Sequence, residues 1–169
     1  MILSGKTIKG LLRSRRLVIK PLGKKQVQPA SVDLRLAGEM LILKGEEIDF
    51  DAEQAYEKIK GGEVVLPPKT HVLVRSIEYV ELPKDIGGMT KLRSSLSRIG
   101  VIFNNAGWVD PGFKGTLTLS VFNSNSCPVK IKSGTRFAQL ILMRLDSESE
   151  GYAGKYSGQR KITGKRKDR

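Results

Sequence analysis

Short runs of β-forming residues, each closed by a turn signal, fill most of this 169-residue chain. Pairs such as Pro67-Pro68, Pro111-Gly112 and Ser133-Gly134 separate the runs, and residues of this kind end strands and start turns. Helical spacing is confined to residues 5–12, after an N-cap at Ser4, and to Met89–Ile99, which stops at Gly100. The pattern predicts an all-β sandwich or barrel with few short helices. The strands are expected at residues 17–19, 30–36, 40–43, 64–66, 70–74, 77–82, 101–103, 116–122, 129–131 and 137–142, with 49–62 as a surface excursion.

Composition narrows the class of protein further. The hydrophobic fraction is 39% and there are 18 glycines, which is ordinary for a chain that buries one core. One Cys and one His exclude an internal disulfide and a zinc nucleobase deaminase site within one chain. No apolar stretch is long enough to span a membrane, and the N-terminus lacks the apolar segment of a secretory signal. We therefore expect a cytoplasmic protein with no membrane partner.

Charge is strongly basic and unevenly distributed. Thirty Lys and Arg residues oppose 17 acidic ones, giving a net charge of +13, and much of the excess follows Gly151. An anionic partner is indicated, either nucleic acid or a small polyphosphate, although a basic tail can also be simply solvated. We expect a β domain over residues 1–150 and a basic C-terminal arm over 151–169 that is mobile and becomes ordered on binding.

Two polar segments suggest chemistry, and each has a plainer interpretation. Arg93, Ser94 and Ser95 lie at the start of the expected helix, where hydroxyl, amide and guanidinium donors suit a polyphosphate; they can also be a cap with a surface arginine. Asp110 precedes a Pro-Gly turn, where a carboxylate can orient a sugar hydroxyl or activate water; it can also form an Asx-turn. His71 lies in an alternating strand pattern, where a single histidine is more often structural than catalytic.

Five segments, taken in order, resemble the dUTPase and dCTP deaminase superfamily across nearly the whole chain. They are residues 28–35, 93–98, 107–115, 134–140 and 154–159. The resemblance implies a distorted β-barrel or jelly-roll-like (β-clip) subunit that forms a homotrimer, with active sites between subunits. It also implies Mg²⁺ as cofactor, bound mainly through the nucleotide phosphates and not by protein ligands.

The resemblance is divided between the two branches of the superfamily. The segments QPASVDLRL, DPGF and GKYSGQ resemble the deaminase branch, whereas residues 119–123 and 136–139 resemble the dUTPase branch. Deaminases have a catalytic Glu five residues beyond the glycine that corresponds to Gly115, and this chain has Ser120 there. A serine hydroxyl alone cannot relay protons near neutral pH, so the interpretation is an archaeal-type dUTPase of the deaminase-like branch, with deamination lost.

The predicted activity is therefore hydrolysis of dUTP to dUMP and pyrophosphate by attack of water at the α-phosphorus. The alternative is a dCTP deaminase that forms dUTP or dUMP, including a bifunctional enzyme; a non-catalytic nucleic-acid-binding module is a third hypothesis, and nucleic acid is not the expected partner. The resemblance implies that Asp110 is the catalytic base and that Phe113 stacks beneath the deoxyribose. The substrate-binding residues that it implies are Arg93, Ser94, Ser95, Arg98, Asn105, Gly107, Phe113, Ser120, Gln139, Lys155, Tyr156 and Gln159.

Overall fold

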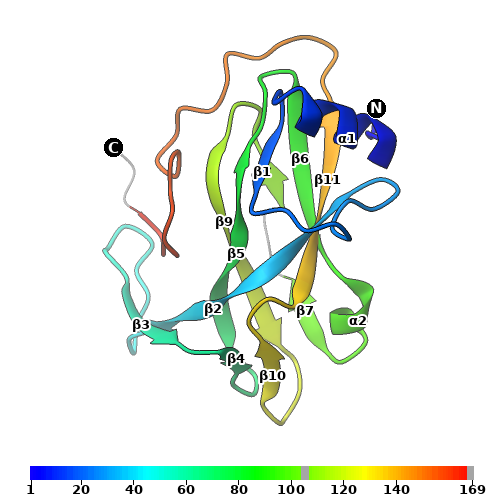
Figure 1. The fold of residues 1–169 in the computed structure, drawn as a ribbon. Coiled ribbons are helices and arrows are strands. Elements are labelled where there is room, and N and C mark those ends of the chain that lie inside the picture. Colours follow the sequence, from blue (N-terminus) through cyan, green and yellow to red (C-terminus); the bar gives the residue numbers. More distant parts are fainter. Residues whose placement is uncertain (104–106, 167–169) are drawn as a thin grey trace.

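The fold is a curled antiparallel β-sheet with a short N-terminal helix at one end, as Figure 1 shows for a computed structural model that describes residues 1–103 and 107–166. In the described residues the strands form a nine-stranded sheet and a separate two-stranded sheet. This arrangement confirms the all-β, barrel-like fold class. The elements in chain order are α1 (Gly5–Arg13), β1 (Val18–Lys20), β2 (Val32–Lys44), β3 (Ala55–Lys60), β4 (Glu63–Leu66), β5 (His71–Glu81), β6 (Ile86–Leu92), α2 (Ser94–Ser97), β7 (Val101–Phe103), β8 (Trp108–Val109), β9 (Lys114–Asn123), β10 (Val129–Lys132) and β11 (Arg136–Arg144).

The long strand β2 connects the two halves of the main sheet. Its first residues pair with β11, its middle with β5, and its last residues also with β3. The strand order is β7-β9-β5-β2-β11-β6-β8, and in Figure 1 β2 runs diagonally across the molecule. A strand that changes partners along its length bends the sheet around its inner face, and that inner face becomes the core.

Alternation along the strands decides which side chains enter the core. In β5, Val72, Val74 and Ser76 are buried, whereas His71 and Leu73 point to the opposite, more exposed face. Strand β9 alternates in the same way and pairs with β5 over most of its length. Each large apolar side chain buried in the core contributes about 1.5–3 kcal/mol. The candidate site lies on the outer face of β5 and β9.

The helix α1 forms where the sequence predicts it. The amide of Thr7 donates to the Ser4 side chain at 3.3 Å, which is the expected N-cap. The helix buries Ile8 and Leu11 in the core.

The second predicted helix is wrong over most of its length. The apolar spacing of 89–99 belongs first to β6, which pairs with β11 through Leu92, and only Ser94–Ser97 is helical. A strand that is buried on both faces can carry apolar residues at any spacing, including three and four apart. The apolar spacing of this segment therefore did not distinguish a helix from a buried strand. Gly100 does end this segment with a left-handed φ of +76°.

Two further boundaries differ from the sequence prediction. The segments 30–36 and 40–43 are one strand, β2, and 70–74 and 77–82 are one strand, β5. The expected surface excursion at 49–62 contains β3, which pairs with the end of β2.

The C-terminal arm packs against the sheet. The described part, residues 151–166, contains Ile162, which is buried, and Gln159, which bridges to Gly115 of β9. Within residues 1–103 and 107–166, no helix has the length and apolar character needed to cross a membrane.

Candidate active site

A cavity of about 420 Å³ lies on the outer face of β5 and β9, beneath the C-terminal arm. Its walls come from β3, β5, β8, β9, the turn after β8, and the arm. Such a volume suits a small molecule of nucleoside size. The lining residues are Tyr56, Leu73, Trp108, Val109, Asp110, Phe113, Leu117, Thr118, Ser120, Tyr152, Tyr156, Gln159, Thr163, Gly164 and Lys165.

Asp110 is held at the mouth of this cavity by its neighbour on β8. The indole Nε1 of Trp108 donates to Asp110 Oδ1 at 2.9 Å, so the carboxylate is oriented by a ring and not by an Asx-turn. The backbone turn that follows is closed by the amide of Phe113 donating to the Asp110 carbonyl at 3.1 Å. Gly112 takes a φ of +77° in this turn, and a Cβ there would meet the arm at Gly151. The second carboxylate oxygen of Asp110 remains available to a ligand or water.

Phe113 forms an apolar wall of the cavity. Its side chain is 7% exposed, and its ring centroid lies 5.8 Å from that of Tyr152 in the arm. A flat apolar surface of this kind is suited to packing against a sugar that lacks one hydroxyl, because it offers that hydroxyl no hydrogen bond.

Ser120 has an unexpected partner. Its Oγ lies 2.5 Å from Nε2 of His71, the single histidine of the chain. His71 pairs with Phe122 across the two strands, and Ser120 pairs with Leu73, so the two polar residues are diagonal neighbours on one face. Partial burial lowers the pKa of His71 below the ordinary histidine value of 6.5, which favours the neutral imidazole at pH 7.

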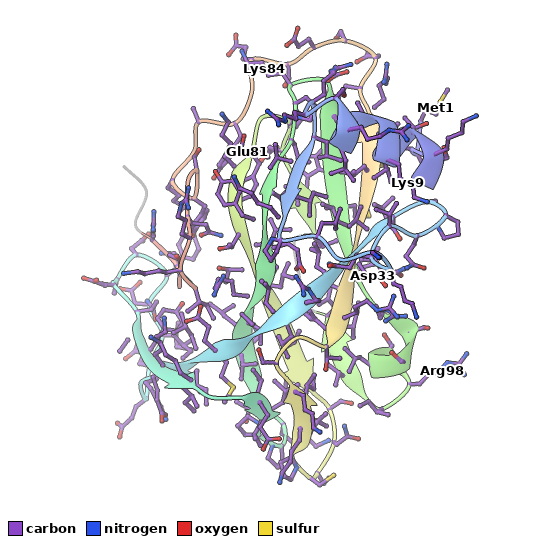
Figure 2. All side chains as sticks on the ribbon, viewed as in Figure 1. Met1, Lys9, Asp33, Glu81, Lys84 and Arg98 are labelled. Atoms are coloured by element: carbon purple, nitrogen blue, oxygen red, sulfur yellow. The ribbon has the colours of Figure 1, made fainter. Side chains whose placement is uncertain are left out.

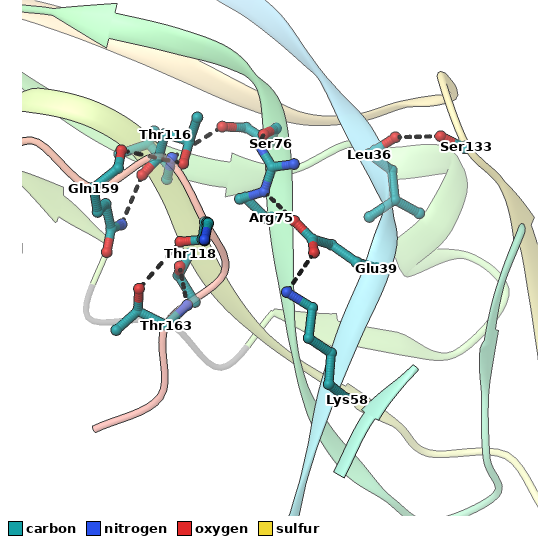
Figure 3. Close-up of polar contacts among 12 residues, drawn as sticks. Leu36, Glu39, Lys58, Arg75, Ser76, Thr116, Thr118, Ser133, Gln159 and Thr163 are labelled. Atoms are coloured by element: carbon teal, nitrogen blue, oxygen red, sulfur yellow. Dashed lines mark hydrogen bonds and ion pairs between the residues drawn. The ribbon is translucent and has the colours of Figure 1, made fainter. Parts of the chain in front are cut away.

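The arm is attached to the sheet through backbone and side-chain bonds of Gln159. Its carbonyl accepts from the amide of Thr116 at 2.9 Å, and its Nε2 donates to the Thr116 carbonyl at 2.6 Å, as Figure 3 shows. The amide of Gly158 donates to the backbone carbonyl of Lys114 at 2.7 Å. Tyr156 lines the cavity, whereas Lys155 lies beyond it, with Nζ donating to the carbonyl of Arg166.

The far end of the arm is held by β3. The hydroxyl of Tyr56 accepts from the amide of Lys165 at 3.1 Å, and Lys165 Nζ lies 4.2 Å from the centroid of the Phe50 ring. A Cβ on Gly164 would come within 2.2 Å of the Tyr56 ring. A side chain at position 164 would therefore force the Tyr56 ring or the arm to shift.

A second polar group lies on β2 and β11, away from the cavity. Asp33 is fully buried, its Oδ2 accepts from Arg136 at 3.0 Å, and Arg93 approaches the same oxygen at 3.8 Å. Its other oxygen, Oδ1, is buried without a hydrogen-bond partner. Gln139 donates to Ser31 Oγ at 3.3 Å on the same part of the sheet.

The short helix α2 follows Arg93. We call the residues of this region the cationic group: Asp33, Arg93, Ser94, Ser95, Arg98, Arg136 and Gln139. Ser94, Ser95 and Arg98 are exposed on it, and Figure 2 shows Arg98 at the edge of the molecule and Asp33 where β2 crosses the neighbouring strand. A four-residue helix has almost no dipole to offer an anion, so donors here act as individual groups.

Gly107 faces a different cavity. Its carbonyl accepts from the amide of Thr90 at 2.7 Å, and it lines a groove between β6 and β7 that, among the described residues, shares only Trp108 with the first cavity. Asn105 lies outside the described residues.

The predicted site residues thus separate into two groups. Asp110, Phe113, Ser120, Tyr156 and Gln159 line one cavity. None of the described residues lining it comes from 93–98 or is Gln139, so one chain does not bring the expected phosphate-binding residues to its own cavity.

Sequence reasoning missed several residues of the cavity. Trp108 stood out only as part of the segment 107–115, and Tyr56 lay in the expected surface excursion. His71, which contacts the cavity residue Ser120 without lining the cavity, was interpreted as structural. Tyr56 and His71 are positioned by pairing between distant strands, and the sequence carries no signal for that register. The contact of Trp108 with Asp110 is local, but no sequence pattern marks it.

An antiparallel barrel with a nucleoside-sized cavity under its own C-terminal arm is the arrangement expected of enzymes in the dUTPase and dCTP deaminase superfamily, which act on nucleotides. Within that superfamily, the model of the dCTP deaminase-like family matches residues 2–145. The chain belongs to this family.

Curated relatives cover almost the whole chain. It is 42% identical over 174 residues to a protein of Sulfurihydrogenibium sp. named "dCTP deaminase, dUMP-forming", covering 98% of this chain and 97% of that protein. It is 40% identical over 149 residues to a protein of Thermococcus gammatolerans named "dCTP deaminase", covering 88% of each.

Solved structures support the same fold. The dCTP deaminase of Agrobacterium tumefaciens superposes with a TM-score of 0.68 at 22% identity, covering 83% of this chain and 47% of that one, so this chain spans about half its length. The dUTPase of phage phi11 gives a TM-score of 0.54 at 15% identity, covering 82% and 99%.

The prediction of a dUTP diphosphatase that has lost deamination is wrong as the main interpretation. Relatives 36–42% identical over 96–98% of the chain are named dUMP-forming dCTP deaminases. The prediction gave decisive weight to one position, Ser120, and treated its hydroxyl as isolated. The structure shows that hydroxyl in contact with an imidazole.

Proposed function

We propose that this protein is a dUMP-forming dCTP deaminase, converting dCTP and two molecules of water to dUMP, pyrophosphate and ammonia. The observation that carries the proposal is that one cavity contains both Asp110 and Ser120. A single bound nucleotide can therefore meet a carboxylate near its α-phosphate and a hydroxyl near its base. The names of the relatives that cover nearly all of the chain support the same activity.

Asp110 is assigned to the phosphate step. Its carboxylate, fixed by Trp108, positions and partly deprotonates a water in line with the α-phosphorus, and pyrophosphate leaves. Because the indole bond occupies Oδ1, Oδ2 is the oxygen that receives the water's proton.

Phe113 and the arm are assigned to binding. The Phe113 ring packs beneath the deoxyribose, and Tyr152 supports it from the arm. Gln159 closes the arm over the nucleotide, while Tyr156 contributes to the wall. Excluding water from the cavity strengthens each polar contact made inside it.

The cationic group is assigned to the triphosphate of a neighbouring subunit. Arg93, Ser94, Ser95, Arg98 and Gln139 lie away from their own chain's cavity, so we propose a homotrimer in which these residues complete the site of the next copy. Arginines suit this role because their guanidinium groups bind phosphate oxygens in pairs.

The described residues are compatible with a Mg²⁺ ion that is bound mainly through the nucleotide phosphates. Residues 1–103 and 107–166 contain no group of three or more His, Cys, Asp or Glu side chains that could hold a metal by themselves. The buried Oδ1 of Asp33, which lacks a partner, is the protein oxygen in the cationic group suited to a cation or its water. When bound, Mg²⁺ would supply neutralisation of phosphate charge.

The test is to incubate the full chain with dCTP and with dUTP separately in the presence of Mg²⁺. We expect ammonia, dUMP and pyrophosphate from dCTP. Ammonia with dUTP as the final product would restrict the proposal to the deamination step. Pyrophosphate from dUTP without ammonia from dCTP would overturn it.

A further inference from the structure

The deamination step needs a group that moves protons at the cytosine ring, and Ser120 on the cavity wall, backed by His71 outside the lining, is suited to it. Attack of water at C4 of cytosine requires a base for the water proton and an acid for the departing amine. Of the side chains lining the cavity, Asp110 is assigned to the phosphate end. Ser120 lines the same cavity from the middle of β9, beside Thr118 and opposite Leu73 of β5.

Ser120 is not an isolated hydroxyl. The 2.5 Å separation of its Oγ from His71 Nε2 is a short hydrogen bond. With the imidazole neutral and its proton on Nδ1, Nε2 accepts from the Ser120 hydroxyl, and the oxygen then carries added negative charge. This nucleophile-and-base contact is the arrangement by which enzymes activate serine hydroxyls.

We propose that Ser120 and His71 together form the proton relay for deamination, with Ser120 as the catalytic residue that contacts the ring and His71 as the positioning residue that exchanges protons through it. This inference rests on the proposed function. It assigns a task to the single histidine of the chain, which no other part of the mechanism uses.

The proton balance of the step is complete. Ser120 Oγ takes a proton from water while its own proton passes to His71 Nε2, and the water oxygen forms a bond to C4 as N3 takes up a proton from solvent. His71 returns its proton through Ser120 to the exocyclic nitrogen. The C4–N4 bond breaks, ammonia leaves, and loss of a proton from the new hydroxyl gives the C4 carbonyl of uracil. No oxidant or second substrate is needed.

Most of the other titratable groups on this face are engaged elsewhere. By strand register, Tyr56, Lys58, Lys60 and Arg75 share the face, together with Glu39 of β2, and Lys60 is exposed where β3 pairs with Glu39. Glu39 accepts from both Lys58 and Arg75, Tyr56 accepts from the arm, and Lys165 donates to the Phe50 carbonyl. Lys69, in the turn before β5, donates to Ser124.

The pH dependence follows from the state of the imidazole. Burial is the cause of the lowered pKa of His71, so the residue remains a proton acceptor down to a pH below 6.5. The rate of ammonia release should therefore fall on the acid side with a midpoint below 6.5. A purely structural histidine would give no such limb in kcat.

The experiment measures ammonia from dCTP across pH 4.5–9 with the full chain, using His71→Gln, Ser120→Ala and the exposed control Ser147→Ala. Glutamine can hydrogen-bond Ser120 but cannot take up its proton. We expect kcat to fall about 100-fold or more in both site variants, with KM little changed, and the control to match the parent. The acid limb should be lost in His71→Gln.

A double variant distinguishes loss of the proton relay from misfolding of the single variants. A carboxylate at position 120 can accept and return a proton by itself, so Ser120→Glu combined with His71→Gln should recover ammonia release above His71→Gln alone. A parent that deaminates dCTP while His71→Gln keeps its kcat and pH profile would overturn the relay and leave the proposed function standing. A parent that releases no ammonia at any pH would overturn both.

Discussion

The indole Nε1 of Trp108 donates a hydrogen bond of 2.9 Å to Oδ1 of Asp110, two residues further along the chain. Trp108 is 49% exposed, so much of its apolar ring surface faces solvent while its Nε1 makes this polar contact beside the cavity. Because the two residues flank Val109, which is buried, their side chains lie on the same side of the short strand β8. The bond leaves one carboxylate oxygen for chemistry.

Asp110→Asn should separate the two halves of the reaction. An amide keeps an oxygen for Trp108 but cannot deprotonate water, so we expect dUTP and ammonia to accumulate from dCTP with at least 100-fold less pyrophosphate. Chromatography of the nucleotide products measures this, with exposed Asp146→Asn as the matched control. Normal pyrophosphate release by Asp110→Asn would remove Asp110 from the base role.

Trp108→Phe should weaken the orientation without removing the base. The ring is retained but its donor is lost, so we expect kcat for pyrophosphate release to fall about tenfold, which corresponds to about 1.4 kcal/mol in the barrier. Ammonia release should change less. Equal loss of both products would show instead that Trp108 holds the nucleotide as a whole.

The sequence predicted the fold class and one half of the site for identifiable reasons. Turn signals such as Gly112 and Gly134, both with positive φ, are local, and they marked the strand ends correctly. Asp110 and Phe113 flank the turn at Gly112, so their proximity is also local. These are the elements for which neighbouring residues in sequence determine the geometry.

The remainder depends on contacts between distant strands. His71 meets Ser120 only because β5 and β9 pair in one particular register, and Tyr56 meets Gly164 only because the arm returns to β3. The helix expected over 89–99 was wrong at its start because β11 pairs with residues 89–92 and extends them, whereas Ser94–Ser97 is helical. Tertiary pairing overrides local periodicity in such segments, and no single sequence displays it.

Phe113 should govern discrimination between deoxyribose and ribose. Phe113→Leu keeps an apolar side chain at this buried position but shortens it, opening space beneath the sugar. We expect kcat/KM for CTP relative to dCTP to rise about tenfold, within the range for a small steric change in an apolar pocket. Phe103→Leu, outside this cavity, is the control. An unchanged ratio in a variant that unfolds at the parent's temperature would contradict the assignment.

Gly164→Ala should release the far end of the arm. The new Cβ would lie 2.2 Å from an atom of the Tyr56 ring, so the ring or the arm has to move, and either movement disturbs the Tyr56–Lys165 hydrogen bond that holds the arm. We expect faster limited proteolysis after residue 151 and a higher KM for dCTP, with the unfolding temperature little changed. Gly10→Ala in α1 is the matched control, because a Cβ there meets nothing within 4 Å and favours the helix.

Glu39 joins β2 to β3 and β5, and its charge should contribute stability that disappears in acid. Figure 3 shows its carboxylate between Arg75, at 2.5 Å, and Lys58, at 2.8 Å. Burial raises the pKa of Glu39, but the hydrogen bonds and charges of Lys58 and Arg75 outweigh burial, so the folded pKa lies below 4.5. A carboxyl group with a lowered folded pKa stabilises the fold above its unfolded pKa, and that stability is lost as the pH falls through the folded value.

Glu39→Gln should therefore reduce the free energy of unfolding by about 1–3 kcal/mol at pH 7, because two partly buried cations lose their partner. The difference from the parent should shrink as the pH falls below 4.5. Urea unfolding at several pH values and one fixed protein concentration measures this. Glu57→Gln is the matched control: its ion pair with Lys44 is exposed, with side chains 47% and 54% accessible, so we expect a change of less than about 0.5 kcal/mol. A Glu39→Gln deficit that stays constant from pH 7 to pH 3 would mean that packing, and not charge, accounts for it.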